Sequence, residues 1–142
     1  MSVEGNKAAA RRFVEEALDK GSSEALFELF LPGAVRHFPS GDITVDPAQP
    51  APPANRSMET RIHHLYGEGN FVTVHLTHHV TFGSSATFKT RAGLIDVSGK
   101  SVEWNAMVVL RFDGTRIAEE WVVSDELQIL MQLGLVKPIA AA

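Results

Sequence analysis

The sequence predicts an α+β fold made of two helices, a meander of antiparallel strands and one short C-terminal helix. Apolar residues recur at helical spacing in the first thirty residues, alternation typical of strands takes over after Ser57, and a helical pattern returns after Asp125. Helices segregated in this way from strands joined by short turns indicate an antiparallel sheet with helices packed against it. A length of 142 residues fits one domain, so we expect a single domain over residues 1–142.

The two N-terminal helices are predicted by apolar spacing and by their end signals. The first helix carries these apolar residues three and four apart, with charged residues between them: Ala10, Phe13, Val14, Ala17 and Leu18. Gly21 is a natural stop. Ser22 or Ser23 can cap a second, shorter helix, which Pro32-Gly33 ends. Two short helices joined by a tight turn predict a hairpin with one apolar side.

A proline-rich segment separates the helices from the main strands. Residues 34–38 form either a short strand or an extended bend. Within 46–55 stand four prolines: Pro47, Pro50, Pro52 and Pro53. Because proline donates no backbone hydrogen bond, this segment is neither a helix interior nor a central strand. We expect an extended surface loop at 46–55, inside the domain.

Alternating apolar residues predict five strands after the loop. They span 58–66, 71–82, 87–95, 102–112 and 116–123. Asp113-Gly114 is a strong hairpin signal. The strand 102–112 is apolar at both parities, so both of its faces should be covered, one by helices and the other by a second subunit. Asp125 opens the terminal helix, and Gly134 lies past its end.

Composition narrows the possible partners. The net charge is −4 and there is no cysteine. No basic field exists to bind nucleic acid or an anionic membrane surface, so neither partner is expected. The absence of cysteine excludes thiol catalysis and cysteine-bound zinc. No apolar run is long enough for a membrane helix, and the first twelve residues lack the apolar core of a secretory signal. We therefore expect a cytoplasmic protein.

The last strand suggests a reactive carboxylate. Strict alternation places Ile117, Glu119, Trp121 and Val123 on one face, and their apolar bulk predicts that this face is the inner one. Glu119 would then lie beside Trp121, where apolar surroundings raise a carboxyl pKa towards acid–base use. The alternative for Glu119 is a structural partner of an inner arginine, or an exposed rim position. Asp125 shares the parity of Glu119, but it also stands where a helix N-cap belongs.

The six histidines do not predict a metal site. Ligands on one strand face are expected two residues apart, and no pair among the strand histidines has this spacing. His75 and His79 share a face but would lie roughly 13 Å apart. We expect them to line a polar cavity. His37 stands alone between helix hairpin and loop, as a donor at a cavity mouth or as an ordinary loop histidine.

At the C-terminal end the sequence resembles a known family. Asp113-Gly114, then Ile117-Ala118-Glu119, Trp121, Asp125 and Gln132-Leu133-Gly134 follow the pattern of the SnoaL-like polyketide cyclase family. The helix hairpin, His37 with Pro39 and the Gly69-Asn70 turn also resemble it. The resemblance implies a nuclear-transport-factor-two-like cone, in which a curved mixed sheet wraps the helices and encloses an apolar pocket. It also implies a homodimer formed through the outer sheet face and chemistry that uses neither metal nor cofactor.

Two departures from the family pattern concern the pocket. The segment 46–55 replaces a helix that most members have there. Val80-Thr81-Phe82-Gly83 stands where members usually have Gly-Thr-His-x-Gly, with Phe82 near the position of the histidine. His78 or His79 could take over from that histidine.

The resemblance implies an enzyme that closes or isomerises a small hydrophobic carbonyl compound by proton transfer. Asp125 is then the expected acid or base, Glu119 the alternative and His37 a hydrogen-bond donor. The expected substrate-binding residues are these: Trp121, Trp104, Phe38, His75 and His79. Because the fold does not fix the activity, a binding or accessory protein without chemistry stays open. A structural module that uses the outer sheet, around a filled cone, is the third possibility.

Overall fold

The computed structural model describes residues 2–49 and 52–140. Its helices are α1 (Val3–Arg12), η1 (Phe13–Asp19), α2 (Ser23–Leu29) and α3 (Glu126–Gln132). Helix α1 continues directly into η1, which has the wider turns of a π-helix. Ser22 caps α2 by accepting a hydrogen bond from the backbone N–H of Ala25, which satisfies one of the free donors at a helix start.

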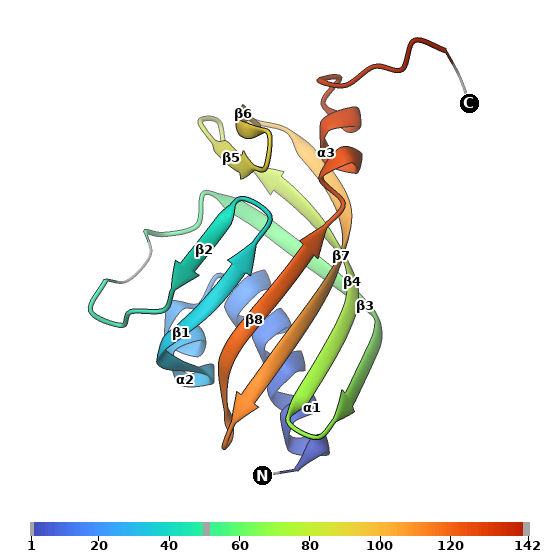
Figure 1. Ribbon diagram of the computed structural model, residues 1–142. Coiled ribbons are helices and arrows are strands. Elements are labelled where there is room, and N and C mark those ends of the chain that lie inside the picture. Colours follow the sequence, from blue (N-terminus) through green and yellow to red (C-terminus); the bar gives the residue numbers. More distant parts are fainter. Residues whose placement is uncertain (1, 50–51, 141–142) are drawn as a thin grey trace.

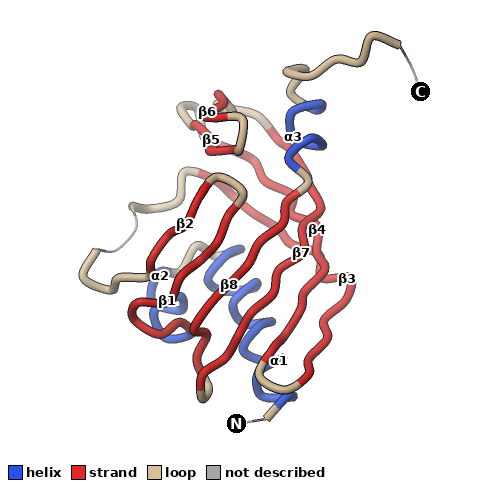
Figure 2. Tube along the Cα trace, in the orientation of Figure 1, coloured by secondary structure: helices blue, strands red, loops and turns tan. Residues whose placement is uncertain are grey.

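In the described part of the chain, eight strands form one large sheet and one hairpin (Figures 1 and 2). The strands are β1 (Phe30–Phe38), β2 (Gly41–Thr44), β3 (Arg56–Glu68), β4 (Phe71–Phe82), β5 (Thr87–Thr90), β6 (Gly93–Asp96), β7 (Ser101–Asp113) and β8 (Arg116–Ser124). The large sheet has the order β2-β1-β8-β7-β4-β3, and β5 pairs only with β6. Strands β1 and β8 run parallel, whereas the other pairs are antiparallel. The sheet is therefore mixed, and the fold is α+β as predicted.

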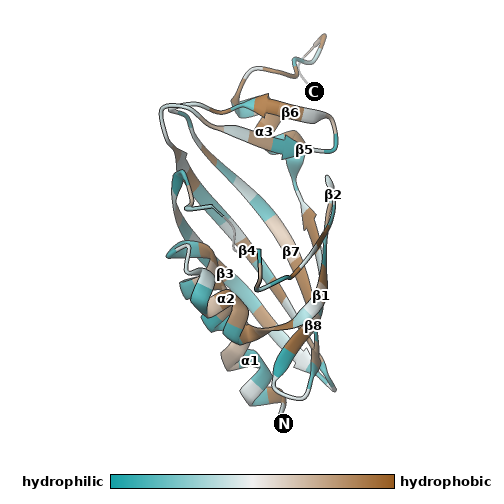
Figure 3. Cartoon of the chain, turned by 90° about the vertical axis from the view of Figure 1, so that its left-hand side faces the viewer, coloured by the Kyte–Doolittle hydropathy of each residue, from teal (hydrophilic) through white to brown (hydrophobic). Residues whose placement is uncertain are grey.

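The sheet curves around the helices. Figure 3 shows α1 and α2 against one end of its concave side, while the hairpin β5–β6 lies at the opposite end. Alternate residues of β4 and β7 are buried against the helices, as the period of a strand requires. At the centre Phe13 of η1 meets Phe30 of β1 edge to face, with ring centroids 5.2 Å apart. Such a pair contributes about 1 kcal/mol beyond the area it buries.

Most predicted elements are present, and two of them differ locally from the prediction. The second helix ends at Leu29, and Pro32-Gly33 lies within β1. The expected strand 87–95 is two short strands, because the chain turns at Arg91-Ala92. In the expected loop, residues 46–49 and 52–55 form neither helix nor strand, and Pro50 lies outside the described residues. In the described part of the chain no helix is long and apolar enough to cross a membrane.

A β-bulge in β8 overturns the predicted inner face of that strand. Phe112 pairs with Ile117 and Arg111 with Glu119, so Ala118 is an extra residue. Ile117 points into the core as predicted, but the parity changes after Ala118. Glu120 is therefore the buried carboxylate, and Val123 is 70% exposed. The prediction that Glu119 and Trp121 face the interior is wrong, because it assumed unbroken alternation.

Candidate functional site

An apolar cavity of about 670 Å³ lies on the concave side of the sheet. Strands β1, β8, β7, β4 and β3 line it on one side, and residues 85–89 around the start of β5 line it on the other. Its volume lies within the roughly 300–1,000 Å³ typical of small-molecule sites. The apolar lining includes Leu18, Phe38, Ile43, Met58, Phe82, Phe88, Trp104, Val108 and Val122. The charged or titratable lining residues are Arg36, Arg56, His78, Lys89 and Glu120.

Arg36 and Glu120 form an ion pair inside this cavity. Their strands run parallel, and the two residues are register partners, so both side chains point inward. Nε of Arg36 donates to Oε1 of Glu120 at 2.5 Å, and the Glu120 side chain is only 2% exposed. A buried carboxylate is tolerated where a cation and a hydrogen bond compensate the lost hydration, and Arg36 provides both.

Three phenylalanine rings surround the guanidinium of Arg36. Its Cζ lies 5.5 Å from the ring centroid of Phe13, 5.3 Å from that of Phe30 and 4.9 Å from that of Phe38. Cation–π attraction and packing hold the charged group against the aromatic wall. Within the described residues its two terminal nitrogens make no hydrogen bond. They are available to a bound molecule.

His78 belongs to a second polar group, which links β4, β3 and the end of η1. Oγ1 of Thr60 donates to Oδ1 of Asp19 at 2.6 Å, and the backbone N–H of Thr60 donates to Oδ2 at 3.0 Å. Nδ1 of His78 lies 2.7 Å from the same Thr60 hydroxyl. Because that hydroxyl gives its one proton to Asp19, it accepts from Nδ1–H of His78. Asp19 thus fixes the tautomer of His78 through Thr60.

The fixed tautomer makes Nε2 of His78 a proton acceptor, and this atom has no hydrogen-bond partner among the described residues. His78 is only 7% exposed and its side chain lines the cavity. Burial, followed by the charge of Arg56, lowers the pKa of His78 to about 4. The imidazole is therefore neutral at pH 7, with its Nε2 lone pair unprotonated. It is a base of about carboxylate strength in an apolar cavity.

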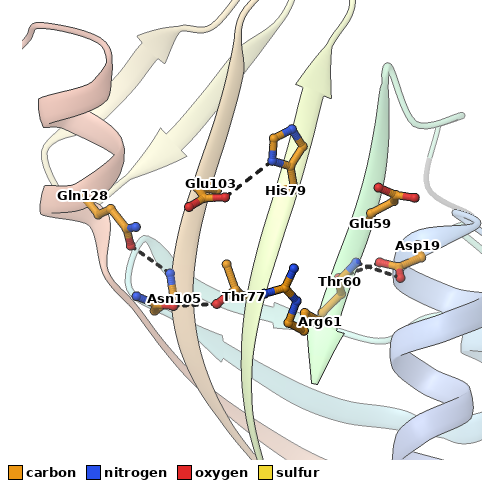
Figure 4. Close-up of a pocket in the computed structure, with 9 residues that line it drawn as sticks. All are labelled: Asp19, Glu59, Thr60, Arg61, Thr77, His79, Glu103, Asn105 and Gln128. Carbon is orange, nitrogen blue, oxygen red and sulfur yellow. Dashed lines mark hydrogen bonds and ion pairs between the residues drawn. The ribbon is translucent and has the colours of Figure 1, made fainter. Parts of the chain in front are cut away.

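A second hollow, of about 700 Å³, is polar, and outer-face residues of β3, β4 and β7 line most of it (Figure 4). Asp19 and Thr60 also line it, at the edge of the sheet. Its side chains largely satisfy one another: Thr77 donates to Asn105, and the backbone N–H of Asn105 donates to Gln128. His79 lies 3.6 Å from Glu103, and both side chains are more than half exposed. These groups are hydrated, so we place the candidate site in the apolar cavity.

His37, Glu119 and Trp121 do come together, but on the outer face. Nε2 of His37 lies 2.7 Å from Oε2 of Glu119, and Nδ1 lies 2.9 Å from Oδ1 of Asp42. The hydrogen bond to Glu119, followed by that to Asp42, raises the pKa of His37. The same bond to His37 is the largest cause that lowers the pKa of Glu119. The His37 ring stacks on Trp121, with centroids 5.6 Å apart. This is a stable surface ion pair, separated by the sheet from the apolar cavity.

The remaining predicted site residues are divided between the two faces. Phe38 and Trp104 line the cavity. His75 lies on the outer face beside His63 and His64, and its Nδ1 is 3.0 Å from Nδ1 of His64. Among the described residues no group of histidines and carboxylates has the geometry of a metal site. Asp125 accepts a hydrogen bond from the backbone N–H of Gln128 at 3.1 Å and caps α3.

Sequence reasoning missed Arg36, Glu120 and the link from Asp19 to Thr60. It named His78 only as a replacement for the absent family histidine. The sequence did contain a signal for His78. The even-numbered residues of the strand 71–82 are the buried ones, so a histidine at position 78 must face the core.

The matching family model and a similar solved structure both concern polyketide cyclases. The model of the family described as SnoaL-like polyketide cyclase matches residues 8–133. No curated protein matches the chain. Among solved structures, IdmH from Streptomyces antibioticus, a proposed polyketide cyclase, is 25% identical. That alignment covers 91% of this chain and 98% of IdmH with a TM-score of 0.66.

Two more distant structures share the fold. AclR from Streptomyces galilaeus, a proposed hydroxylase, is 16% identical over 98% of this chain and 87% of its own, with a TM-score of 0.72. An LEH-like epoxide hydrolase from M. tuberculosis is 15% identical over 92% of this chain and 90% of its own, with a TM-score of 0.68. At these identities the likeness concerns architecture alone, and it confirms the nuclear-transport-factor-two-like fold.

Proposed function

Because this chain belongs to the SnoaL-like polyketide cyclase family, we propose that its apolar cavity binds a small hydrophobic carbonyl compound and catalyses proton transfer on it. The reaction is of the cyclase or isomerase type and needs no cofactor. The observation that carries the proposal is the neutral, buried His78, whose Nε2 is a proton acceptor beside an apolar binding space.

In the proposed step Nε2 of His78 takes a proton from the carbon next to the substrate carbonyl. The electron pair of the broken C–H bond forms a carbon–carbon double bond, and the carbonyl oxygen becomes an enolate oxygen. In an isomerisation the imidazolium returns the proton to another carbon. In a cyclisation the enolate carbon forms a bond to a second carbonyl carbon of the same molecule, and the imidazolium protonates the new alkoxide.

Arg36 is the proposed partner of the developing oxyanion. Within the described residues its terminal N–H groups make no hydrogen bond, which leaves donors for an oxygen in the cavity. Fixed donors in a dry site stabilise charge that appears during a reaction, because they need no reorganisation. Glu120 acts here as a positioning residue: it holds the guanidinium in place and does not itself contact the substrate.

The sequence-based candidates enter this proposal differently. Phe38 and Trp104 form walls of the binding space. Glu119 and His37 are paired with each other on the outer face, and Asp125 caps a helix, so we assign the acid–base role to His78. The second candidate function is a small-molecule-binding protein without chemistry, which the apolar lining supports equally well.

Deuterium exchange separates the enzyme from the binder. The probe is 2-tetralone, an apolar ketone with acidic hydrogens next to its carbonyl, followed by proton NMR in D₂O. We expect exchange in the presence of the protein to exceed exchange in buffer, and His78→Gln to lose this excess. The matched control is His63→Gln, which removes a histidine from the outer face and should leave the rate unchanged. If the protein binds 2-tetralone without exchange above buffer, it is a binder.

We further propose that a second copy of the chain covers the outer face of the sheet. Large apolar side chains are exposed there on β3, β4, β7 and β8: Tyr66, Phe71, Met107 and Val123. Exposed apolar side chains on one sheet face favour a protein-interaction surface. These side chains lie on the face opposite the cavity, so a dimer formed through them leaves the proposed site free.

A further inference from the structure

We propose that the compound bound in the cavity is an anionic amphiphile. Its carboxylate or similar group pairs with Arg56, and its apolar body lies on the rings of Phe82, Phe88 and Trp104. This inference rests on the proposed function in one respect, since it names the charge of the compound that the same cavity takes. The inference depends mainly on Arg56, a half-buried cation that lines an apolar cavity and forms no salt bridge with any of the described residues.

The charges along the cavity do not balance. Arg36, Arg56 and Lys89 are positive, whereas Glu120 is the one acidic residue of the described lining. Glu120 neutralises Arg36 through their ion pair. Arg56 and the exposed Lys89 have no acidic counterpart among the described lining residues, although the whole chain has a net charge of −4. An excess of positive charge in one cavity of an acidic protein favours an anionic ligand.

Arg56 makes weak contacts within the protein. Among the described residues its guanidinium donates only to the backbone carbonyl of Leu18, 3.5 Å from Nη1, at the limit of a hydrogen bond. Asp19 is the closest acidic group by its charge, but both of its carboxylate oxygens accept hydrogen bonds from Thr60. The planar fork of the guanidinium thus keeps donors free, and a ligand carboxylate can accept two of them.

The burial of Arg56 is costly and only partly compensated. Loss of hydration lowers the pKa of Arg56, and the charge of Asp19 offsets this only in part. A carboxylate bound at Arg56 would restore favourable charge interactions and displace little structure. The position thus favours an anion over a neutral polar group.

Arg56 also lies next to the proposed reaction centre. Its strand β3 pairs with β4, and the charge of Arg56 is one of the two causes that lower the pKa of His78. An anion at Arg56 would cancel part of that charge, so the pKa of His78 would rise when the ligand binds. The ligand would then make the base that acts on it stronger.

The apolar body of the ligand has a matching surface. Phe88 lies between Phe82 and Trp104, with ring centroids 6.0 Å and 5.4 Å away. These three rings line the cavity from β4, β5 and β7, and Phe82 is the register partner of Arg56. A flat or extended apolar group can lie on them while its anionic end reaches Arg56.

Two fluorescent probes test the inference. 8-Anilinonaphthalene-1-sulfonate carries an apolar ring system and one negative charge, and N-phenyl-1-naphthylamine is nearly the same molecule without the charge. We expect the wild-type protein to bind the anionic probe at least about tenfold more tightly, the value of one well-placed charge-assisted contact. Arg56→Gln should remove this preference and change the affinity for the neutral probe by less than about twofold. Arg56→Lys, which keeps the charge, should retain part of the preference.

The control variant is Arg61→Gln, on the same strand but facing the outer hollow. It should leave both affinities unchanged, and thermal unfolding checks that each variant is folded. Equal affinity of the wild-type protein for the two probes, or an equal loss for both probes in Arg56→Gln, would overturn the inference. The exchange assay uses the uncharged 2-tetralone, so an absence of exchange would leave the preference for the anionic probe untouched. Equally, the exchange could occur in a protein that shows no preference for the anionic probe. The two proposals thus fail independently.

Discussion

Glu120 and Arg36 are neighbours across the one parallel strand pair of the large sheet, and they join the two chain segments most distant in sequence on that sheet. The carboxylate is almost completely buried, and the guanidinium lies among three phenylalanine rings. The pair therefore fixes the position of a strong donor inside an apolar cavity. Removal of Arg36 alone should therefore cost more stability than removal of both charged side chains.

Arg36→Met should destabilise the protein strongly, because it leaves Glu120 as a buried charge without a partner. Loss of one partner of a buried pair costs about 3–5 kcal/mol, and urea unfolding of wild type and variant measures it. The double variant Arg36→Met/Glu120→Leu should recover most of that loss, since no unpaired charge remains. A loss below about 1 kcal/mol in Arg36→Met would mean that water reaches the Glu120 side chain in the variant.

The buried His78 should make the protein less stable in mild acid. Burial lowers its pKa in the folded state to about 4, from an ordinary value of 6.5. Between these values the unfolded chain binds a proton at this position and the folded chain does not. The free energy of unfolding should thus fall as the pH drops from about 6.5 to about 4, by about 3 kcal/mol from this group alone.

Urea unfolding at several pH values tests this linkage. His78→Gln cannot take up the proton, so its stability should fall less over the same interval. The control His63→Gln removes an outer-face histidine and should keep the wild-type dependence. Parallel curves for the wild type and His78→Gln would show that His78 titrates normally.

The sequence predicted β4 at its observed bounds because alternation there is unbroken over twelve residues. The inner face of β8 was predicted wrongly because the extra residue of the bulge is Ala118. Its small side chain fits either face of the sheet, so the apolar pattern does not reveal the bulge. The pairing of Arg36 with Glu120 was also out of reach, since it depends on the parallel contact between β1 and β8. The candidate site thus depends on the bulge and on strand order, and local sequence reports neither.

The outer face supplies a prediction about assembly. Val123 is 70% exposed on the proposed dimer surface. Val123→Glu should convert a dimer into a monomer, because two like charges would meet across a symmetric interface. Sedimentation equilibrium measures the mass, and probe binding in the cavity should persist. A monomeric wild-type protein at micromolar concentration would contradict the proposed assembly.

Variants of Asp125 test whether Asp125 or His78 is the acid–base residue. Its side chain caps α3, so Asp125→Ala should lower stability by about 1 kcal/mol, while Asp125→Asn keeps an acceptor oxygen and should lower it by less. If His78 is the base, Asp125→Asn leaves the exchange of 2-tetralone within about twofold of wild type, since the cap lies outside the residues that line the cavity. A folded Asp125→Asn variant without exchange would instead assign the proton transfer to Asp125. The same result would reduce His78 to a buried structural histidine, and the comparison with His78→Gln in one assay decides between them.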